Sequence, residues 1–279
     1  MSGTRQNRPP IDALQAAALA IRRNVLEMVG RNGQGYVQQG LGAADLFTYL
    51  YFAELRLDEA DPTWSERDRL FLSTAHNSAV FHATLAERDL IDSARLATYC
   101  DDGSELEINV SERLGPLVEC TCGSLGQGLS VAVGLAQAAK RRGLTFRTYV
   151  ILGDGELQEG QTWEAAMYAG SNGLDNLCLI VDVNRLQVEG ETDRVLDMAP
   201  IDDKWRAFGW AVREVDGHDF DGLADAFDWA RANAGRPSVL LARTIVGKGV
   251  PFLEGRMSHN MVLPADVAAR ALAVLGDAS

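Results

Sequence analysis

The sequence predicts an α/β fold with a mostly parallel sheet and helices on both faces. Three observations lead to this prediction. An apolar run at Tyr149–Leu152 indicates a buried strand, which stops at a Gly-Asp-Gly turn. Helical spacing follows over Glu159–Ala169, and a second apolar run covers Leu177–Val183. Strand, helix and strand in this order form a βαβ unit, whose two strands are parallel.

The same alternation of helices and strands continues on both sides of this unit. Pro9 and Pro10 precede the first helical pattern, and Lys140–Arg142 suit the dipole at the end of a helix that the turn at Gly123–Gly128 opens. Short apolar runs predict strands at residues 69–72, 211–215 and 238–245. Apolar residues at helical spacing predict further helices at residues 12–30, 43–52, 78–88, 201–208, 223–234 and 264–275, with a glycine-rich loop before residue 43.

Asp154 and Asn184 follow the two strands of the central unit and lie thirty positions apart (184 − 154). The carboxyl ends of parallel strands meet at one sheet edge, so we expect these side chains to lie close together. Carboxylate and amide oxygens suit Mg²⁺ or Ca²⁺ that also holds a phosphate. Gly153 and Gly155 would let backbone amides approach that phosphate. The alternative is a turn with an acidic tip, because Asp-Gly is common in turns.

A Gly-Asp-Gly turn followed after thirty residues by Asn resembles the diphosphate-binding motif of thiamine diphosphate enzymes. The strings GDGELQEGQTWEAA and LDNLCLIVDVNRLQVEG resemble transketolase, specifically the N-terminal subunit of a transketolase split into two chains. The resemblance covers residues 12–260. It implies a thiamine-diphosphate-binding fold with one diphosphate-binding domain at residues 11–279, behind a tail at residues 1–10 that we expect to be disordered.

The resemblance also implies a set of ligands for the cofactor and its metal. Asp154, Asn184 and the backbone carbonyl of Leu186 would hold Mg²⁺ or Ca²⁺. Other positions would contact the cofactor itself: Gly153, Gly155, Glu156 and Asn184 around the diphosphate, and Gly123, Ser124 and Leu125 around the aminopyrimidine ring.

Three further side chains match positions that reach the cofactor in the family. His76 stands in a loop between a strand and a helix, and it would contact the diphosphate and reach the reaction centre. Lys248 in Gly247–Gly249 would meet the diphosphate, and His259 would reach both cofactor and substrate. Glu159 matches a glutamate proposed to link two active sites, although an acid at a helix N-terminus is equally consistent with stabilisation by the dipole.

Two positions depart from the family. Tyr36 and Asn109 stand where transketolases carry histidines that handle the sugar substrate. An amide keeps hydrogen bonding but cannot exchange protons near neutral pH. These losses argue against a standard sugar phosphate donor and favour a specialised pathway, while the cofactor ligands are retained.

Charge and cysteine content limit the other function classes. The formal net charge of −13 repels nucleic acid and anionic membrane surfaces. The sequence has no apolar run near eighteen residues and no signal-peptide pattern at its N-terminus. Cys120 and Cys122 have a single residue between them, which is not the C-x-x-C redox spacing, and no second pair supports a zinc site. We therefore expect a reduced, cytoplasmic protein.

In the family, the glutamate that activates the cofactor belongs to a pyrimidine-binding domain that follows the diphosphate-binding domain. The resemblance covers only the latter, so it implies a separate partner chain and an α2β2 heterotetramer that transfers a ketol or acyl unit to an aldehyde acceptor. Two alternatives stay open at this stage. One is the α subunit of a 2-oxo acid dehydrogenase, and the other is a non-catalytic regulatory paralogue.

Overall fold

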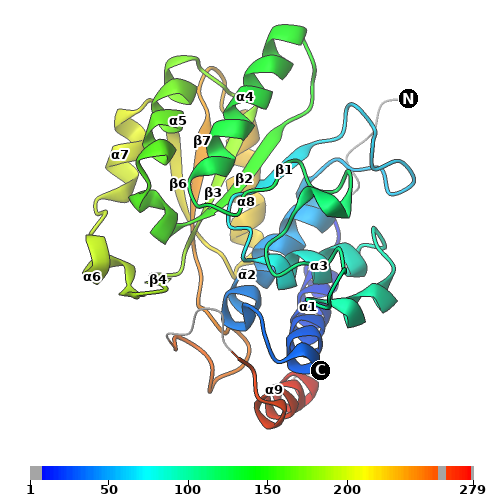
Figure 1. The fold of residues 1–279 in the computed structure, drawn as a ribbon. Helices are drawn as coiled ribbons and strands as arrows, with labels where there is room; N and C mark the ends of the chain where they lie inside the picture. The colour runs from blue at the N-terminus through cyan, green and yellow to red at the C-terminus, as the bar shows by residue number, and fades with distance from the viewer. Residues whose placement is uncertain (1–7, 257–261, 278–279) are drawn as a thin grey trace.

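A computed structural model describes residues 8–256 and 262–277. Five strands form one sheet in which all neighbouring strands run parallel, in the order β1-β2-β3-β7-β6 (Figure 1). The prediction of an α/β fold with a parallel sheet is confirmed. The strands are β1 (Arg69–Leu72), β2 (Thr148–Gly153), β3 (Leu177–Val183), β6 (Ala211–Asp216) and β7 (Ser238–Arg243).

Helices cover both faces of the sheet, and alternate strand residues pack against each layer. Tyr149 and Ile151 of β2 belong to one core cluster, whereas Val150 and Leu152 belong to the other, as the two-residue period of a strand requires. The first layer contains α1 (Ile11–Asn32), α2 (Val37–Tyr49), α3 (Ser78–Glu87), α8 (Phe220–Ala232) and α9 (Ala265–Asp277). The second contains α4 (Gln127–Arg142), α5 (Gly160–Ser171) and α7 (Ile201–Ala207).

Short elements connect these layers and carry part of the site. A π-helical turn, η1 (Leu50–Glu54), extends α2, and a short ribbon of two antiparallel strands follows β3. The remaining short elements are η2 (Ser93–Thr98), η3 (Glu112–Leu114), η4 (Asp154–Gln158), β4 (Leu186–Gln187), β5 (Gly190–Glu191) and α6 (Thr192–Leu196). Within the residues described, no helix is long and apolar enough to cross a bilayer.

Helix α2 begins six residues earlier than the sequence suggested, so the predicted glycine-rich loop is wrong from Val37 onward. The two glycines inside this helix serve close packing. A Cβ on Gly40 would lie 3.2 Å from Val25, and one on Gly42 would lie 2.8 Å from the carbonyl oxygen of Ile245. Tertiary contacts here outweigh the low helix propensity of glycine.

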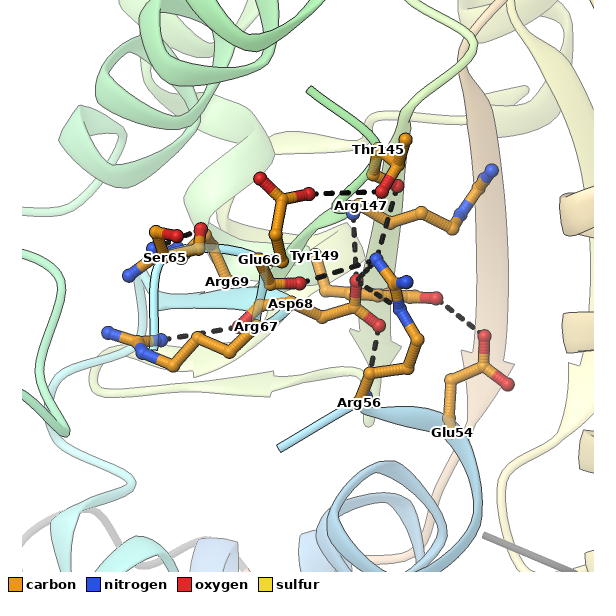
Figure 2. Close-up of polar contacts among 10 residues, drawn as sticks. All are labelled: Glu54, Arg56, Ser65, Glu66, Arg67, Asp68, Arg69, Thr145, Arg147 and Tyr149. Atoms are coloured by element: carbon orange, nitrogen blue, oxygen red, sulfur yellow. Dashed lines mark hydrogen bonds and ion pairs between the residues drawn. The ribbon is translucent and has the colours of Figure 1, made fainter. Parts of the chain in front are cut away.

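A buried carboxylate, Asp68, joins the amino ends of β1 and β2 (Figure 2). Its side chain is fully buried and accepts hydrogen bonds from the Arg147 amide at 2.8 Å and the Arg56 amide at 3.0 Å. The Arg56 guanidinium completes the pair at 3.2 Å. Nearby, the Tyr149 hydroxyl donates to Glu54 at 2.5 Å. This network fixes the register of the first two strands at the end remote from their carboxyl ends.

We predict that Asp68→Asn lowers the free energy of unfolding by about 3 kcal/mol, because it removes the buried charge of the pair and leaves the partly buried Arg56 guanidinium without its counter-charge. Urea unfolding followed by circular dichroism measures this change. Asp102→Asn, at an exposed carboxylate in a loop, is the matched control and should stay within about 0.5 kcal/mol of wild type. Equal urea midpoints for wild type, Asp68→Asn and Asp102→Asn would show that Asp68 does not stabilise the fold in this way.

The imidazole of His82 is fully buried among aromatic rings, with Tyr99 and Phe81 at centroid distances of 5.9 and 5.7 Å. Burial, aided by the charge of Arg95, lowers the pKa of His82 to about 3. Neither ring nitrogen has a hydrogen-bond partner among the described residues. The ring therefore stays neutral in the fold, whereas the unfolded chain binds a proton below the ordinary histidine pKa of about 6.5.

It follows that His82 makes the fold lose stability as pH falls from about 6.5 toward 3, with no contribution above that window. We predict that His82→Leu abolishes this contribution, because the unfolded variant no longer binds the one extra proton that His82 takes up on unfolding. Urea unfolding at several pH values between about 4 and 7 gives, for each protein, the slope of the free energy of unfolding against pH. This range covers most of the interval between the two pKa values of the imidazole. Identical slopes for wild type and variant would show that the imidazole is not held neutral.

Candidate active site

A cleft of about 300 Å³ opens at the carboxyl ends of β1, β2 and β3. Ligands usually bind at this edge of a parallel sheet. The structure brings together in this cleft most of the residues that the sequence singled out: His76, Leu125, Gly153, Asp154, Gly155, Glu156, Glu159, Asn184 and Leu186.

Asp154 lies directly after β2, at the first residue of η4, and is 3% exposed. One carboxylate oxygen accepts a hydrogen bond from the Gly155 amide at 3.0 Å, and the other accepts from the Arg185 amide at 2.8 Å. Burial, and then the neighbouring charge of Asp182, raise the pKa of Asp154 to about 7. The fold thus holds a carboxylate in a place where its negative charge is costly.

Asn184 follows β3 and is joined to Asp154 through the next residue. Arg185 has a φ of 63°, which is left-handed for a non-glycine residue and costs roughly 1–2 kcal/mol. This conformation accompanies the hydrogen bond from the Arg185 amide to Asp154. The Asn184 side-chain oxygen accepts from the Leu186 amide at 2.9 Å, and its amide nitrogen donates to Asp182 at 3.3 Å. The two predicted ligands are therefore held beside each other.

These residues fit a divalent cation. Asp154 and Asp182 are both almost fully buried, and they repel each other. In residues 8–256 and 262–277, no lysine or arginine side chain is recorded in an ion pair with either carboxylate. Asp182 accepts hydrogen bonds from Asn184 and from the Thr244 hydroxyl. A cation bound by oxygen atoms would relieve this excess of negative charge.

The donor set is mixed in its chemistry. Among the described residues there is no cluster of three or more histidine, cysteine, aspartate or glutamate side chains placed to hold a metal ion. Asp154, Asn184 and Leu186 all line the cleft, and the expected donor set is one carboxylate, one carboxamide and one backbone carbonyl. Such a set suits a hard cation that keeps part of its coordination for waters and phosphate oxygens.

Glu156 connects the β2 turn to the turn before α4. Its carboxylate accepts from the Gly126 amide at 2.6 Å and from the Ser73 hydroxyl, which in turn accepts from the Gly128 amide at 3.2 Å. Burial raises the pKa of Glu156 to about 7. Gly126 itself has a φ of 83°, and a Cβ there would lie 2.8 Å from Glu159. Glu156 therefore ties together the two turns expected to hold opposite ends of one ligand.

The two positions that depart from the family pattern lie around His76. The Tyr36 ring lies 5.4 Å from the imidazole of His76, centroid to centroid, at an angle of 57°. Asn109 is exposed, and the amide of the next residue, Val110, donates to the carbonyl of Ala75 at 3.1 Å. Both substitutions therefore border the loop that carries the predicted catalytic imidazole.

Lys248 does not line the cleft that contains most of the other predicted site residues. It lines a separate, open cleft of about 460 Å³ beside β6 and β7. His218 anchors this region, because its Nδ1 lies 2.7 Å from Asp45 and its Nε2 accepts the Ile245 amide at 2.9 Å. These contacts show that His218 holds its loop against α2 and the segment that follows β7.

Two further predicted residues, Gly123 and Ser124, are not among those that line the cleft. Gly123 and Ser124 are exposed, just before α4. His259 lies outside the described residues, as do residues 1–7 of the predicted tail. Arg8, at the end of that tail, forms an exposed ion pair with Asp228 at 2.9 Å.

The cleft also contains residues that sequence reasoning missed. Gln39 and Thr74 lie on its wall, and so does Gln187, whose side chain would come within 3.3 Å of a Cβ on Gly155. Asp182 orients the Asn184 side chain by accepting a hydrogen bond from its amide nitrogen. The string Asp182-Val183-Asn184 held a signal for this contact, since residues two apart in a strand point to the same face.

Comparison with known proteins identifies the family. The profile described as "Transketolase, thiamine diphosphate binding domain" matches residues 13–276. The chain belongs to the transketolase family. It is 31% identical to the transketolase of Campylobacter jejuni, with a TM-score of 0.89 over 96% of this chain and 43% of that one. The chain thus spans about two fifths of the length of the solved transketolases that it matches.

Two curated relatives match over nearly their whole length. The chain is 41% identical to the 6-deoxy-6-sulfo-D-fructose transketolase subunit SqwG of Clostridium sp. (strain MSTE9), over 94% of this chain and 96% of the relative. It is 39% identical to an apulose-4-phosphate transketolase subunit of Actinobacillus succinogenes, over 95% of this chain and 97% of the relative. Transketolase is therefore favoured over a 2-oxo acid dehydrogenase subunit or a regulatory paralogue.

We predict that Asp154→Asn weakens Mn²⁺ binding in the presence of thiamine diphosphate by at least about tenfold, or 1.4 kcal/mol. The same change should leave the free energy of unfolding in metal-free buffer unchanged or higher, because it removes a buried like-charge repulsion with Asp182. Electron paramagnetic resonance of Mn²⁺ and urea unfolding measure the two quantities. Asp225→Asn, on the exposed face of α8, is the control. Unchanged Mn²⁺ affinity would place the metal elsewhere.

Proposed function

We propose that this chain is the diphosphate-binding subunit of a two-chain, thiamine-diphosphate-dependent transketolase. It would transfer a ketol or acyl unit from a donor to an aldehyde acceptor, forming a carbon–carbon bond. The observation that carries the proposal is the placement of Asp154 and Asn184 at the ends of adjacent parallel strands, joined through the Arg185 amide. Residues 11–279 would form one diphosphate-binding domain.

In this proposal the metal and the diphosphate bind along the β2–β3 edge. Asp154, Asn184 and the Leu186 carbonyl would hold Mg²⁺ or Ca²⁺, and Gly153 and Gly155 would bring backbone amides to the phosphate oxygens. Thiamine diphosphate supplies a nucleophilic carbon and then an electron sink.

The remaining residues would orient and enclose the cofactor. The turn at Gly123–Leu125 would hold the aminopyrimidine ring, positioned by Glu156 through Gly126. His76 would donate to the diphosphate and exchange a proton with substrate. His259 and Lys248 would add cationic contacts, Lys248 by reaching from the cleft beside β7. Glu159, which lines the cleft, would run toward the partner and couple the two active sites.

A partner chain completes the site in this proposal. Both relatives described above are named as subunits, which supports a partner for this chain. It would supply the pyrimidine-binding domain with its activating glutamate, in an α2β2 heterotetramer. We place the enzyme in the cytoplasm, where structural disulfides are rare, in keeping with its four free cysteines.

The proposed donor is a ketose that carries an anionic terminal group and is not one of the common sugar phosphates. The relatives' names point to a sulfonate-bearing and a phosphate-bearing ketose at similar identity, 41% and 39%, so similarity alone does not choose between them. Tyr36 and Asn109 support a changed donor, since both stand beside the His76 loop where histidines are expected.

The test uses the chain co-purified with its partner, with thiamine diphosphate and Mg²⁺ present. Donors are 6-deoxy-6-sulfo-D-fructose and apulose 4-phosphate, each offered with glyceraldehyde 3-phosphate, and xylulose 5-phosphate, offered with ribose 5-phosphate so that the products differ from the substrates; products are identified by mass spectrometry. We expect transfer from one of the first two donors that depends on cofactor and partner. Transfer from neither, together with pyruvate decarboxylation and lipoyl transfer, would favour the dehydrogenase subunit instead.

We predict that Tyr36→His or Asn109→His raises kcat/KM for xylulose 5-phosphate by at least about tenfold, because an imidazole restores proton exchange beside His76. Tyr36→Phe, which keeps the ring but not the hydroxyl, is the matched control and should show no gain. Steady-state kinetics with the partner present measures this effect. If neither histidine variant gains activity, the two positions do not determine the donor.

A further inference from the structure

Cys120 and Cys122 lie immediately before the turn expected to hold the aminopyrimidine ring. Both thiols are free, and their sulfur atoms are 3.1 Å apart. A disulfide bond measures about 2.05 Å, so the two sulfurs need to approach by only about 1 Å to form one. The spacing in the sequence differs from the C-x-x-C motif, and only the folded backbone shows that the two side chains meet.

The fold holds this segment by its neighbouring residues. Glu119 forms ion pairs with Arg67 and with Arg69, the latter at 3.7 Å. Thr121 donates to a carboxylate oxygen of Glu112 through its amide at 3.2 Å and its hydroxyl at 3.0 Å. With residues 119 and 121 anchored by these contacts, the sulfur atoms of Cys120 and Cys122 are held beside each other.

The two thiols differ in exposure and acidity. Cys120 is partly exposed, whereas Cys122 is only 1% exposed. A hydrogen bond from the Cys122 thiol lowers the pKa of Cys120, against the opposing effects of burial and of the carboxylates of Glu112 and Glu119. The same hydrogen bond and burial raise the pKa of Cys122. Cys120 is therefore the accessible thiol with the greater thiolate character, which favours it as the attacking group.

We propose that Cys120 and Cys122 form a reversible dithiol–disulfide site, with Cys120 as the reactive thiol and Cys122 as the resolving thiol. The oxidant is a low-molecular-weight disulfide such as oxidised glutathione. This site is separate from the transfer reaction and needs neither the cofactor nor the partner chain.

The reaction proceeds by two thiol–disulfide exchanges. The Cys120 thiolate attacks one sulfur of the oxidant, which forms a mixed disulfide and releases one reduced thiol. The Cys122 thiol then loses its proton and attacks the Cys120 sulfur, which releases the second reduced thiol. Two protein thiols are oxidised to one disulfide, and the oxidant gains the two electrons and two protons that they lose.

The other cysteines provide contrast within the same chain. Cys178 is completely buried in β3. Cys100 is partly exposed, like Cys120, but no other sulfur is recorded within hydrogen-bond distance of it among the described residues. Cys100→Ser is therefore a matched control that removes an accessible thiol without touching the pair.

The experiment equilibrates the full-length native chain in glutathione redox buffers, quenches with acid and alkylates the remaining thiols. Trypsin then releases residues 114–140 as one peptide containing both cysteines. We expect this peptide to lose two hydrogen atoms and to escape alkylation in oxidising buffer, and to return to the dithiol in reducing buffer. Cys100→Ser should behave as wild type, whereas Cys120→Ser and Cys122→Ala should form no such disulfide.

A native fold that preorganises the pair should also favour the disulfide by at least about tenfold over the urea-unfolded chain in the same buffer. Far-UV circular dichroism verifies that each variant is folded before it is compared. The proposal is overturned if both cysteines of the native chain are alkylated in every buffer. It is equally overturned if a glutathione adduct on Cys120 persists unresolved beside a free Cys122.

Discussion

The candidate site depends on one hydrogen bond, from the Arg185 amide to the buried carboxylate of Asp154 at 2.8 Å. It joins the ends of β2 and β3, and it forms because these strands are parallel neighbours in the sheet. The bond accompanies a left-handed residue at position 185 and a carboxylate held beside a second buried acid, Asp182. This strain and like-charge repulsion at one sheet edge support the proposal that a cation binds there.

Further contacts extend this edge into a complete cleft. The Glu156 carboxylate joins the turn after β2 to Gly126, which lies 30 residues earlier in the chain and directly before α4. Ser73, at the end of β1, joins the same link. At the opposite end of the sheet, Asp68 fixes β1 against β2. The sheet therefore positions the cleft, whereas Tyr36 and Asn109, which we propose to bear on substrate choice, lie in the segments around the His76 loop.

Much of this could be predicted from local sequence, and the rest depended on long-range contacts. The strands β1 and β3 lie at the residues predicted, because buried parallel strands are continuous apolar runs with sharp ends. Asp154 and Asn184 could be paired because strand topology dictates where strand ends lie. The early start of α2 could not be predicted, since its glycines are typical of a loop in the sequence, whereas in the fold Gly40 packs against Val25 and Gly42 against Ile245. Neither the contact of Glu156 with Gly126 nor the meeting of Cys120 and Cys122 has a signature in spacing alone.

The cation site proposed at the β2–β3 edge is tested most directly by a crystal structure of the chain with its partner, thiamine diphosphate and Mn²⁺, with the metal located by anomalous scattering. We expect Mn²⁺ at the β2–β3 edge, bound by a carboxylate oxygen of Asp154, the amide oxygen of Asn184 and the carbonyl of Leu186, with diphosphate oxygens completing its coordination. Mn²⁺ bound in another cleft, with Asp154 and Asn184 still contacting only protein atoms, would contradict it.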